Sequence, residues 1–247
     1  MNKAIMCHVV AGFPDEKASL QMLVGLGRSG VAAIEIQIPF SDPIADGETI
    51  MRANDVALES GMTTAGSFKL IEQARQQGVD TDIYVMSYVQ KVQHFGMADF
   101  CRQAAEHGVR GLIIPDLPYD SPEFDNLREL TAKYEIELVP VLSPGMPESR
   151  LEALLGYKPK TVYVTSQRGI TGNKYTPADQ LKQLVATIRQ QSKAKVMIGF
   201  GIASSSDVDN ALSIGDIAVV GSAVVKTIQS SGIKDALAYV KTLVAGK

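Results

Sequence analysis

The chain alternates short apolar runs with longer segments in which apolar residues recur at helical spacing. Eight apolar runs, rich in Val and Ile, mostly lack alternating polar residues, as expected of strands covered by helices. They cover residues 4–11, 31–38, 82–88, 109–114, 136–142, 161–165, 195–200 and 217–220. The helical segments cover residues 16–28, 65–76, 97–106, 122–133, 177–190, 205–212 and 233–244. The pattern predicts alternating strands and helices along the whole chain.

Eight strands alternating with helices in 247 residues predict an α/β protein with a single (β/α)8 TIM-barrel domain over residues 1–247. Capping residues support the helix boundaries, since Asp15 and Thr64 precede the first two segments and Gly78 follows the second. The alternative is an open doubly wound sheet, which usually has fewer strands and a G-x-G-x-x-G turn after the first. Here that turn reads Ala11-Gly12-Phe13-Pro14, so the barrel is favoured.

Composition narrows the classes of function. The chain has 24 Lys and Arg against 27 Asp and Glu, a net charge of -3, which argues against nucleic-acid binding. No apolar run approaches the ~20 residues that span a bilayer. Two cysteines and three histidines without metal-ligand spacing provide neither a disulfide framework nor a metal site. We therefore expect a cytoplasmic protein that binds no membrane and no metal.

The second predicted strand carries a carboxylate on its inward face. Side chains alternate along a strand, so Glu35 and Gln37 share one face while Ile34, Ile36 and Ile38 share the other. The apolar face meets the helices, so Glu35 points into the barrel. Desolvation there would raise its pKa toward the range of general acid–base catalysis. The alternative is a structural glutamate that is hydrogen-bonded to a polar neighbour.

Two further residues have a structural and a functional interpretation. Asp46 precedes Gly47 and a helical stretch that starts near Glu48. It is either the N-cap of that helix or a second carboxylate facing the pocket of Glu35. Tyr163 shares a face of the sixth strand with Thr161 and is either a core residue or a pocket residue.

The ends of the last two strands have the composition of a phosphate site. They read Gly199-Phe200-Gly201 and Gly221-Ser222-Ala223. Glycines let backbone N–H groups approach phosphate oxygens, and a helix N-terminus adds partial positive charge. In phosphate-binding barrels the loops after strands seven and eight form the site. The alternative is that the glycines only permit tight turns.

The loop after the sixth strand combines small residues with cations. It contains Gly169, Thr171 and Gly172 between Arg168 and Lys174. This composition is typical of a mobile lid that closes over an anion, and also of an ordinary flexible loop.

Several motifs together resemble the tryptophan synthase alpha chain family. They are Ala11-Gly12-Phe13-Pro14, Pro39-Phe40-Ser41-Asp42-Pro43-Ile44-Ala45-Asp46-Gly47, Ile113-Ile114-Pro115-Asp116-Leu117-Pro118, Gly169-Ile170-Thr171-Gly172, Gly199-Phe200-Gly201-Ile202 and Gly221-Ser222-Ala223. The resemblance runs from about residue 4 to the end, and the motifs occur in the family's order and spacing.

The resemblance implies a (β/α)8 lyase that cleaves indole-3-glycerol phosphate, a phosphate ester, to indole and glyceraldehyde 3-phosphate. It assigns acid–base catalysis to Glu35 and contact with the indole nitrogen to Asp46. It implies no metal or organic cofactor. Substrate-binding residues implied by the resemblance are Tyr163, Thr171, Gly172, Gly201, Gly221 and Ser222. The loop after the second strand, with Asp42 and Pro43, is expected to contact a tryptophan synthase beta chain in an alpha2-beta2 complex.

The chain departs from the family's pattern near the predicted site. Gln37 stands where the family usually has Gly, Glu48 replaces a Pro and Met51 replaces a Gln. A side chain at position 37 is expected to narrow the indole pocket or to hydrogen-bond Glu35. Two other functions remain open: a stand-alone lyase that releases free indole or cleaves a related phosphate ester, and a non-catalytic subunit that binds a phosphate ligand and regulates a partner.

Overall fold

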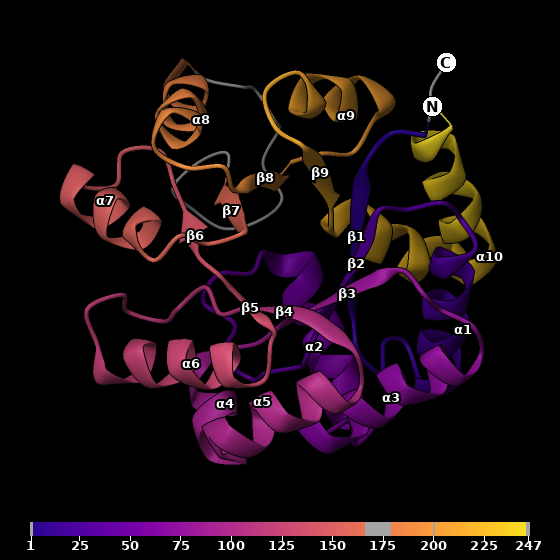
Figure 1. Ribbon diagram of the computed structural model, residues 1–247. Coiled ribbons are helices and arrows are strands. Elements are labelled where there is room, and N and C mark those ends of the chain that lie inside the picture. The colour runs from indigo at the N-terminus through magenta and orange to yellow at the C-terminus, as the bar shows by residue number, and fades with distance from the viewer. Residues whose placement is uncertain (1, 166–178, 200, 246–247) are drawn as a thin grey trace.

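The computed structural model describes residues 2–165, 179–199 and 201–245, which form a barrel of parallel strands surrounded by helices (Figure 1). The strands are β1 (Ile5–Val10), β2 (Ala33–Gln37), β3 (Asp82–Met86), β4 (Val109–Ile113), β5 (Glu137–Val139), β6 (Val141–Leu142), β7 (Thr161–Thr165), β8 (Lys195–Gly199) and β9 (Ile217–Val220). The helices are α1 (Glu16–Gly27), α2 (Glu48–Glu59), α3 (Thr64–Gln76), α4 (Val89–Phe95), α5 (Met97–Glu106), α6 (Pro122–Lys133), α7 (Glu148–Gly156), α8 (Asp179–Gln191), α9 (Ser205–Leu212) and α10 (Ser222–Val244). All eight predicted apolar runs are confirmed as strands.

The segment that runs from β5 to β6 changes its pairing partner halfway along, and the sheet closes at this segment. The strand order is β5-β4-β3-β2-β1-β9-β8-β7-β6, so the two ends of the sheet are consecutive in sequence. Pro140 separates β5 from β6 because it has no N–H to donate to the ladder, while its carbonyl still accepts from the N–H of Tyr163 at 3.0 Å. The fifth predicted strand is therefore two short strands, β5 paired with β4 and β6 paired with β7.

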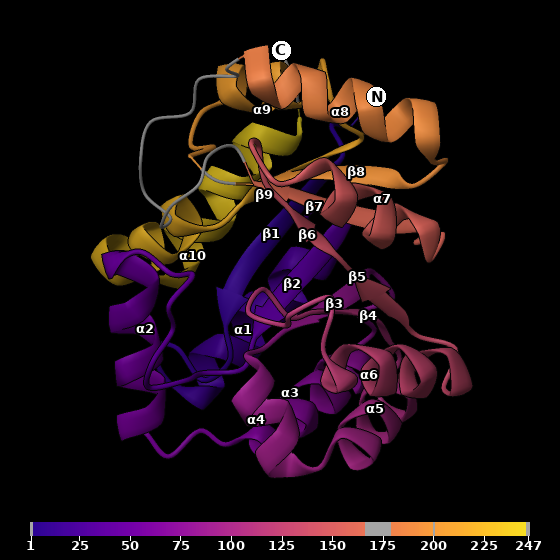
Figure 2. The same ribbon diagram turned by 90° about the vertical axis from the view of Figure 1, so that its left-hand side faces the viewer.

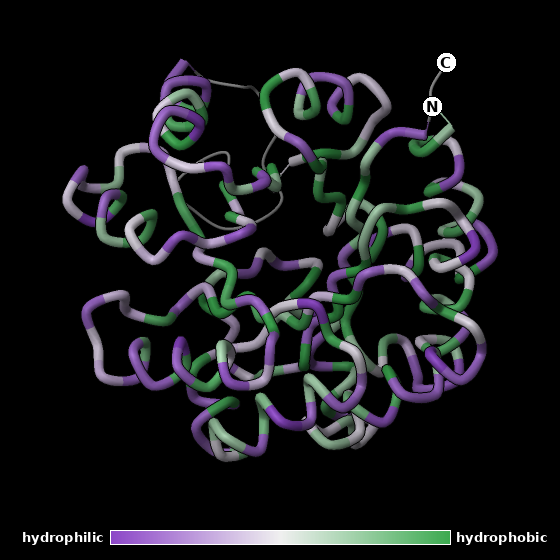
Figure 3. Tube along the Cα trace, viewed as in Figure 1, coloured by the Kyte–Doolittle hydropathy of each residue, from purple (hydrophilic) through white to green (hydrophobic). Residues whose placement is uncertain are grey.

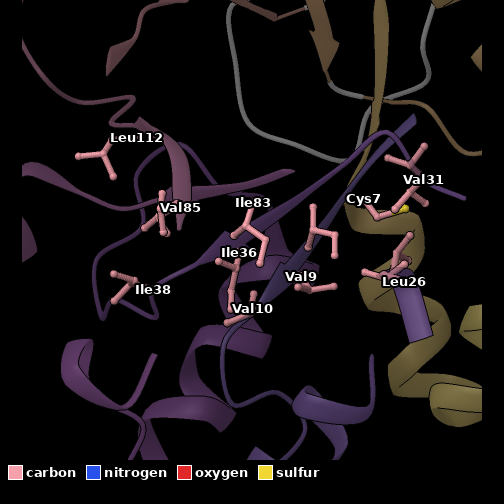
Figure 4. Packing of buried hydrophobic residues seen from close by; sticks show 14 of the residues in the cluster. Cys7, Val9, Val10, Leu26, Val31, Ile36, Ile38, Ile83, Val85 and Leu112 are labelled. Carbon is pink, nitrogen blue, oxygen red and sulfur yellow. The ribbon is translucent and has the colours of Figure 1, made fainter. Parts of the chain in front are cut away.

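Two apolar clusters lie on the two sides of the strands. The outer cluster packs the strands against the helices, and Figure 4 shows Ile36, Ile83 and Val85 in it. The inner cluster fills the barrel and includes Met6 and Met197. Figure 3 shows that the strands are mostly hydrophobic, whereas the outer helices alternate between hydrophobic and hydrophilic residues. The outward face of β2 is thus apolar, as its sequence predicts.

Local sequence signals explain where several helices begin. The Asp15 side chain caps α1 by accepting from the N–H of Ala18, and Thr63, one residue before the predicted Thr64, caps α3. The last predicted helix corresponds to the second half of α10, which is interrupted at Gly232 with φ 80°. The sequence did not predict α4 and α7. Within the described residues no helix combines the length and apolar character needed to cross a membrane.

The strands direct their carboxyl ends toward one side of the barrel. In Figure 2, β1 runs toward the side on which α2 and α10 lie, and these two helices also contact each other. Loops after parallel strands gather at this end of a barrel. The residues that follow β2 and β9 are thereby brought together.

Candidate active site

A pocket opens at the carboxyl ends of the strands. Its empty volume is about 610 Å³, including space open to solvent. Its lining includes six residues predicted as site residues from four separate chain segments: Glu35, Asp46, Tyr163, Gly201, Gly221 and Ser222. The other two predicted substrate-binding residues, Thr171 and Gly172, lie outside the described residues.

Glu35 points into the barrel, as the alternation along β2 predicts. It is 3% exposed and lies opposite His8 in the β1–β2 register. The His8 Nδ1 and Glu35 Oε2 atoms are 2.9 Å apart, and both side chains line the pocket. The Glu35 carboxylate thus has the polar partner that the structural interpretation expects. It also has access to the pocket, as the catalytic interpretation requires. Because Oε2 faces His8, Oε1 is the oxygen that remains for a bound molecule.

The Glu35 carboxylate raises the pKa of the His8 imidazole. Burial by itself lowers the pKa of His8, but the negative charge of Glu35 and its hydrogen bond outweigh burial, and Asp46 and Gln37 act in the same direction. The pKa of His8 therefore lies above its usual value of 6.5. In this buried pair the charged imidazolium of His8 is thus favoured when the Glu35 carboxylate is ionised.

Asp46 is held in the pocket wall and does not cap a helix. The N-cap of α2 is Gly47, which makes no side-chain capping bond, so the N-cap interpretation of Asp46 is wrong. The Asp46 carboxylate is 4% exposed and accepts from Gln37 Nε2 at 2.6 Å and from the Tyr88 hydroxyl at 3.0 Å. Burial raises its pKa, while His8, Gln37 and Tyr88 partly offset that effect by favouring the ionised form.

Gln37 supports Asp46 and makes no bond to Glu35. It is completely buried, and its amide nitrogen also lies 3.3 Å from the Asn54 side-chain oxygen. The second expectation for this residue, a bond to Glu35, is not what the structure shows. The other expectation was that a side chain at position 37 narrows the pocket, and this is not what the structure shows, because Gln37 is not among the residues that line the pocket.

Tyr163 is both a core residue and a pocket residue. It is 8% exposed, belongs to the inner cluster and lines the pocket. Gly199 makes room for it, since a Cβ there would lie 2.3 Å from the Tyr163 hydroxyl oxygen. Burial, with added repulsion from Glu35 and Asp46, raises the pKa of Tyr163 well above its usual value, so the phenol stays neutral.

The first turn of α10 faces the pocket without a side-chain cap. Its N-cap is Gly221, and its first residue is Ser222. By contrast, α9 has a closed capping box in which Ser204 and Asp207 satisfy each other's backbone groups. The first N–H groups of α10 are therefore the ones available to an anionic ligand, with Gly201 (φ 77°) on the pocket wall beside them.

The two predicted partner-contact residues differ in exposure. Asp42 is exposed, whereas Pro43 is buried and its carbonyl accepts from the N–H of Asp46. The next residue, Ile44, is 74% exposed, although it is large and apolar. Ile44 is therefore a large apolar side chain that this loop exposes on the surface.

Sequence reasoning missed His8 and Tyr88 as site residues. The signal for His8 was available, because it alternates with Met6 and Val10 on the first strand, opposite the second. Tyr88 lies beyond β3 and reaches Asp46 across 42 residues of sequence. That contact could be identified only from the three-dimensional structure.

The fold and the pocket define a class of protein. Two buried carboxylates, a neutral tyrosine and an uncapped helix N-terminus meet at the carboxyl end of a parallel barrel, where the active sites of TIM-barrel enzymes lie. The family model described as tryptophan synthase alpha chain matches residues 1–245. The chain belongs to the tryptophan synthase alpha chain family, a family of lyases.

Individual relatives agree with this assignment. The tryptophan synthase alpha chain of Chloroflexus aggregans is 34% identical over 246 residues, which cover 98% of this chain and 91% of that protein. The alpha chain of Granulibacter bethesdensis is 38% identical over 225 residues, covering 91% and 80%. A solved structure of tryptophan synthase from Mycobacterium tuberculosis superposes with a TM-score of 0.90 at 29% identity, covering 99% of this chain and 92% of that one.

Proposed function

We propose that this chain cleaves indole-3-glycerol phosphate to indole and glyceraldehyde 3-phosphate, as the alpha subunit of a tryptophan synthase in tryptophan biosynthesis. One observation carries the proposal. Glu35 and Asp46 line the same pocket as the uncapped N-terminus of α10. An acid–base group, an anionic stabiliser and a phosphate subsite are thus available to one ligand.

The first chemical step is protonation of the indole ring. Glu35 gives a proton from Oε1 to C3, and the ring supplies the electron pair of the new C–H bond. Positive charge then develops on the indole nitrogen. The buried carboxylate of Asp46, fixed by Gln37 and Tyr88, stabilises this charge most strongly where water is excluded.

The second step breaks the carbon–carbon bond. The side-chain hydroxyl next to C3 returns a proton to Glu35, and the electron pair of its O–H bond forms the carbonyl of the aldehyde. The electron pair of the C–C bond returns to the ring and restores indole. Glu35 regains its proton, so it is unchanged after one cycle.

The phosphate group is assigned to the other end of the pocket. Gly201, Gly221 and Ser222 line it, and the first N–H groups of α10 are oriented for anion binding. Thr171 and Gly172 remain predicted phosphate-side residues from the resemblance alone. Tyr163 contributes an apolar ring with a neutral hydroxyl between the two ends.

A beta chain is the proposed partner, in an alpha2-beta2 complex. The supporting observation is the loop after β2, which has Asp42 and Ile44 on its surface and Asp46 in the pocket. A partner that binds this loop would contact residues close to Asp46, the proposed catalytic carboxylate of the loop.

The test measures indole release from indole-3-glycerol phosphate by the purified chain, with and without a tryptophan synthase beta chain. We expect release that the beta chain stimulates. Glu35→Gln should lower kcat by about 10²- to 10⁴-fold and Asp46→Asn by about 10²- to 10³-fold. His94→Asn, at an exposed position, is the matched control.

The results of this test distinguish the three candidate functions. No release in either condition overturns the proposal. Rapid release that a beta chain does not change would support the stand-alone lyase. If Glu35→Gln left biological function intact, the regulatory subunit would be the better account.

A further inference from the structure

His8 is a buried ionisable group inside the pocket that the mechanism above does not use. It is 5% exposed, extends from β1 and lines the pocket together with Glu35. Its Nδ1 lies 2.9 Å from Glu35 Oε2. The proposed acid–base residue therefore has a second ionisable group in direct contact with it.

Two buried atoms without partners show where a second N–H of this histidine would find an acceptor. Among the described residues, neither His8 Nε2 nor Gln37 Oε1 has a hydrogen-bond partner, although both atoms are buried. A neutral imidazole carries one N–H, whereas an imidazolium carries two. In the imidazolium, Nδ1–H donates to Glu35 and Nε2–H is available to the carbonyl oxygen of Gln37. The Gln37 amide is among the groups that favour the protonated ring.

The groups around His8 agree with a positive charge at this place. Glu35 faces it from β2, and Asp46, from the loop after β2, adds a second negative charge. Tyr163, on β7, is neutral because burial raises its pKa well above the usual value. Tyr88, which contacts Asp46, is neutral for the same reason. The two carboxylates are thus the anionic neighbours of His8.

We propose that His8 is a positioning residue for Glu35, and that its imidazolium form supports cleavage of indole-3-glycerol phosphate. The inference rests on the proposed function. His8 holds Oε2, which directs Oε1 toward the substrate. When Glu35 has passed its proton to C3, the resulting carboxylate lies beside the positive charge of His8. The proton that later leaves the substrate hydroxyl returns to Oε1, and His8 keeps its own proton throughout.

His8 stabilises the reaction intermediate more than it stabilises the protein with bound substrate. A carboxylate that forms in a buried site without a counter-charge is costly. His8 offsets that cost only after proton transfer, so it accelerates the chemical step more than it strengthens binding. The step needs a protonated Glu35 beside a protonated His8, so activity should fall as the pH rises and the His8–Glu35 pair loses the first of its two protons.

The activity test compares two variants of this residue. His8→Phe keeps a ring and removes both the charge and the donor. His8→Asn keeps an N–H near the position of Nδ1 and removes the charge. We expect kcat to fall about 10- to 100-fold in His8→Phe, less in His8→Asn, and KM to change little in either. In both variants the alkaline decline of the native chain should move to higher pH, because the proton donor then has no positive charge beside it, whereas His94→Asn should leave the decline in place.

A second readout needs no substrate. The chain has three histidines, so imidazole NMR resonances can be assigned by their absence in His8→Phe and His94→Asn. We expect His8 to titrate above 6.5 and its pKa to fall in Glu35→Gln. This separates the two proposals, because a native chain that releases no indole overturns the proposed function and with it the role of His8, whatever the NMR titration shows.

The inference is overturned if His8→Phe retains kcat within about twofold and keeps the same alkaline decline. It is also overturned if His8 titrates at or below 6.5 in the native chain, or if Glu35→Gln leaves that titration unchanged. Should His8→Phe fail to fold, as judged by circular dichroism, the same criteria apply to His8→Asn.

Discussion

The side-chain amide of Gln37 donates a hydrogen bond of 2.6 Å to Oδ2 of Asp46. The Tyr88 hydroxyl donates to the same oxygen, so two donors converge on one atom of the carboxylate. Both donors favour the ionised form and oppose the effect of burial on the pKa of Asp46. The proposed stabiliser of the indole cation is thereby kept available as an anion.

Gln37→Met tests this support. The substitution keeps the length of the side chain and removes the donor, so the pKa of Asp46 should rise further. Because Asp46 must be ionised in the proposed mechanism, the acid limb of the pH profile of kcat/KM should move to higher pH. Gln90→Met, at an exposed position after β3, is the matched control. An acid limb that stays in place in Gln37→Met would contradict this role.

The contact between His8 and Glu35 predicts how the free energy of unfolding depends on pH. A histidine whose pKa is raised on folding contributes stability that is complete below its unfolded pKa, about 6.5, and is lost as the pH rises through the folded pKa. The free energy of unfolding should therefore decline on the alkaline side of 6.5. Glu35→Gln lowers the pKa of His8 and should make this decline smaller. Urea unfolding at a series of pH values measures it, and equal pH dependence in both proteins would refute the assignment.

Gly221→Ala tests the phosphate subsite. The backbone at Gly221 (φ -109°) accepts an L side chain, and the new Cβ would lie 3.4 Å from the His8 Cβ, so the fold should be kept. The added methyl group should obstruct the approach of phosphate to the first N–H groups of α10. We expect KM to rise about tenfold with a smaller effect on kcat. Gly156→Ala, at the end of α7 with open space around it, is the control. An unchanged KM would place the phosphate elsewhere.

Ile44→Asp tests the partner surface. Ile44 is 74% exposed in the loop that leads to Asp46, and a charge there should weaken an apolar contact with a beta chain. We expect the concentration of beta chain that gives half-maximal stimulation to rise about tenfold or more, while indole release by the isolated chain stays the same. Ile44→Leu keeps the apolar surface and should behave like the native chain. Equal stimulation of all three proteins would exclude this loop from the interface.

The sequence predicted those features that depend on local periodicity. The inward orientation of Glu35 follows from the alternation along β2, because one face of the strand is uniformly apolar. The glycines at positions 201 and 221 could be placed at strand ends for the same reason. The pairing of strands then brings these positions into one pocket, since parallel strands place their carboxyl ends together.

Features that depend on contacts distant in sequence were not predictable in the same way. Asp46 was compatible with an N-cap, and only its contacts with Gln37 and Tyr88 show that its carboxylate turns toward the pocket. The partner of Glu35 is His8, which lies 27 positions earlier on a strand whose other residues are mostly apolar. Helix α4 was missed because it is short and has no side-chain cap.

The interruption at Pro140 gives the barrel a preferred place to open. β5 and β6 contain three and two residues, and each pairs with only one neighbouring strand, whereas β1 pairs on both sides. Two cavities adjoin this seam, and Pro140 lines both of them. Amide protons there should exchange with solvent sooner than those of β1 and β2. Breathing of the barrel should thus begin at the pocket wall that contains Val141, and not at β1 and β2, which carry His8 and Glu35.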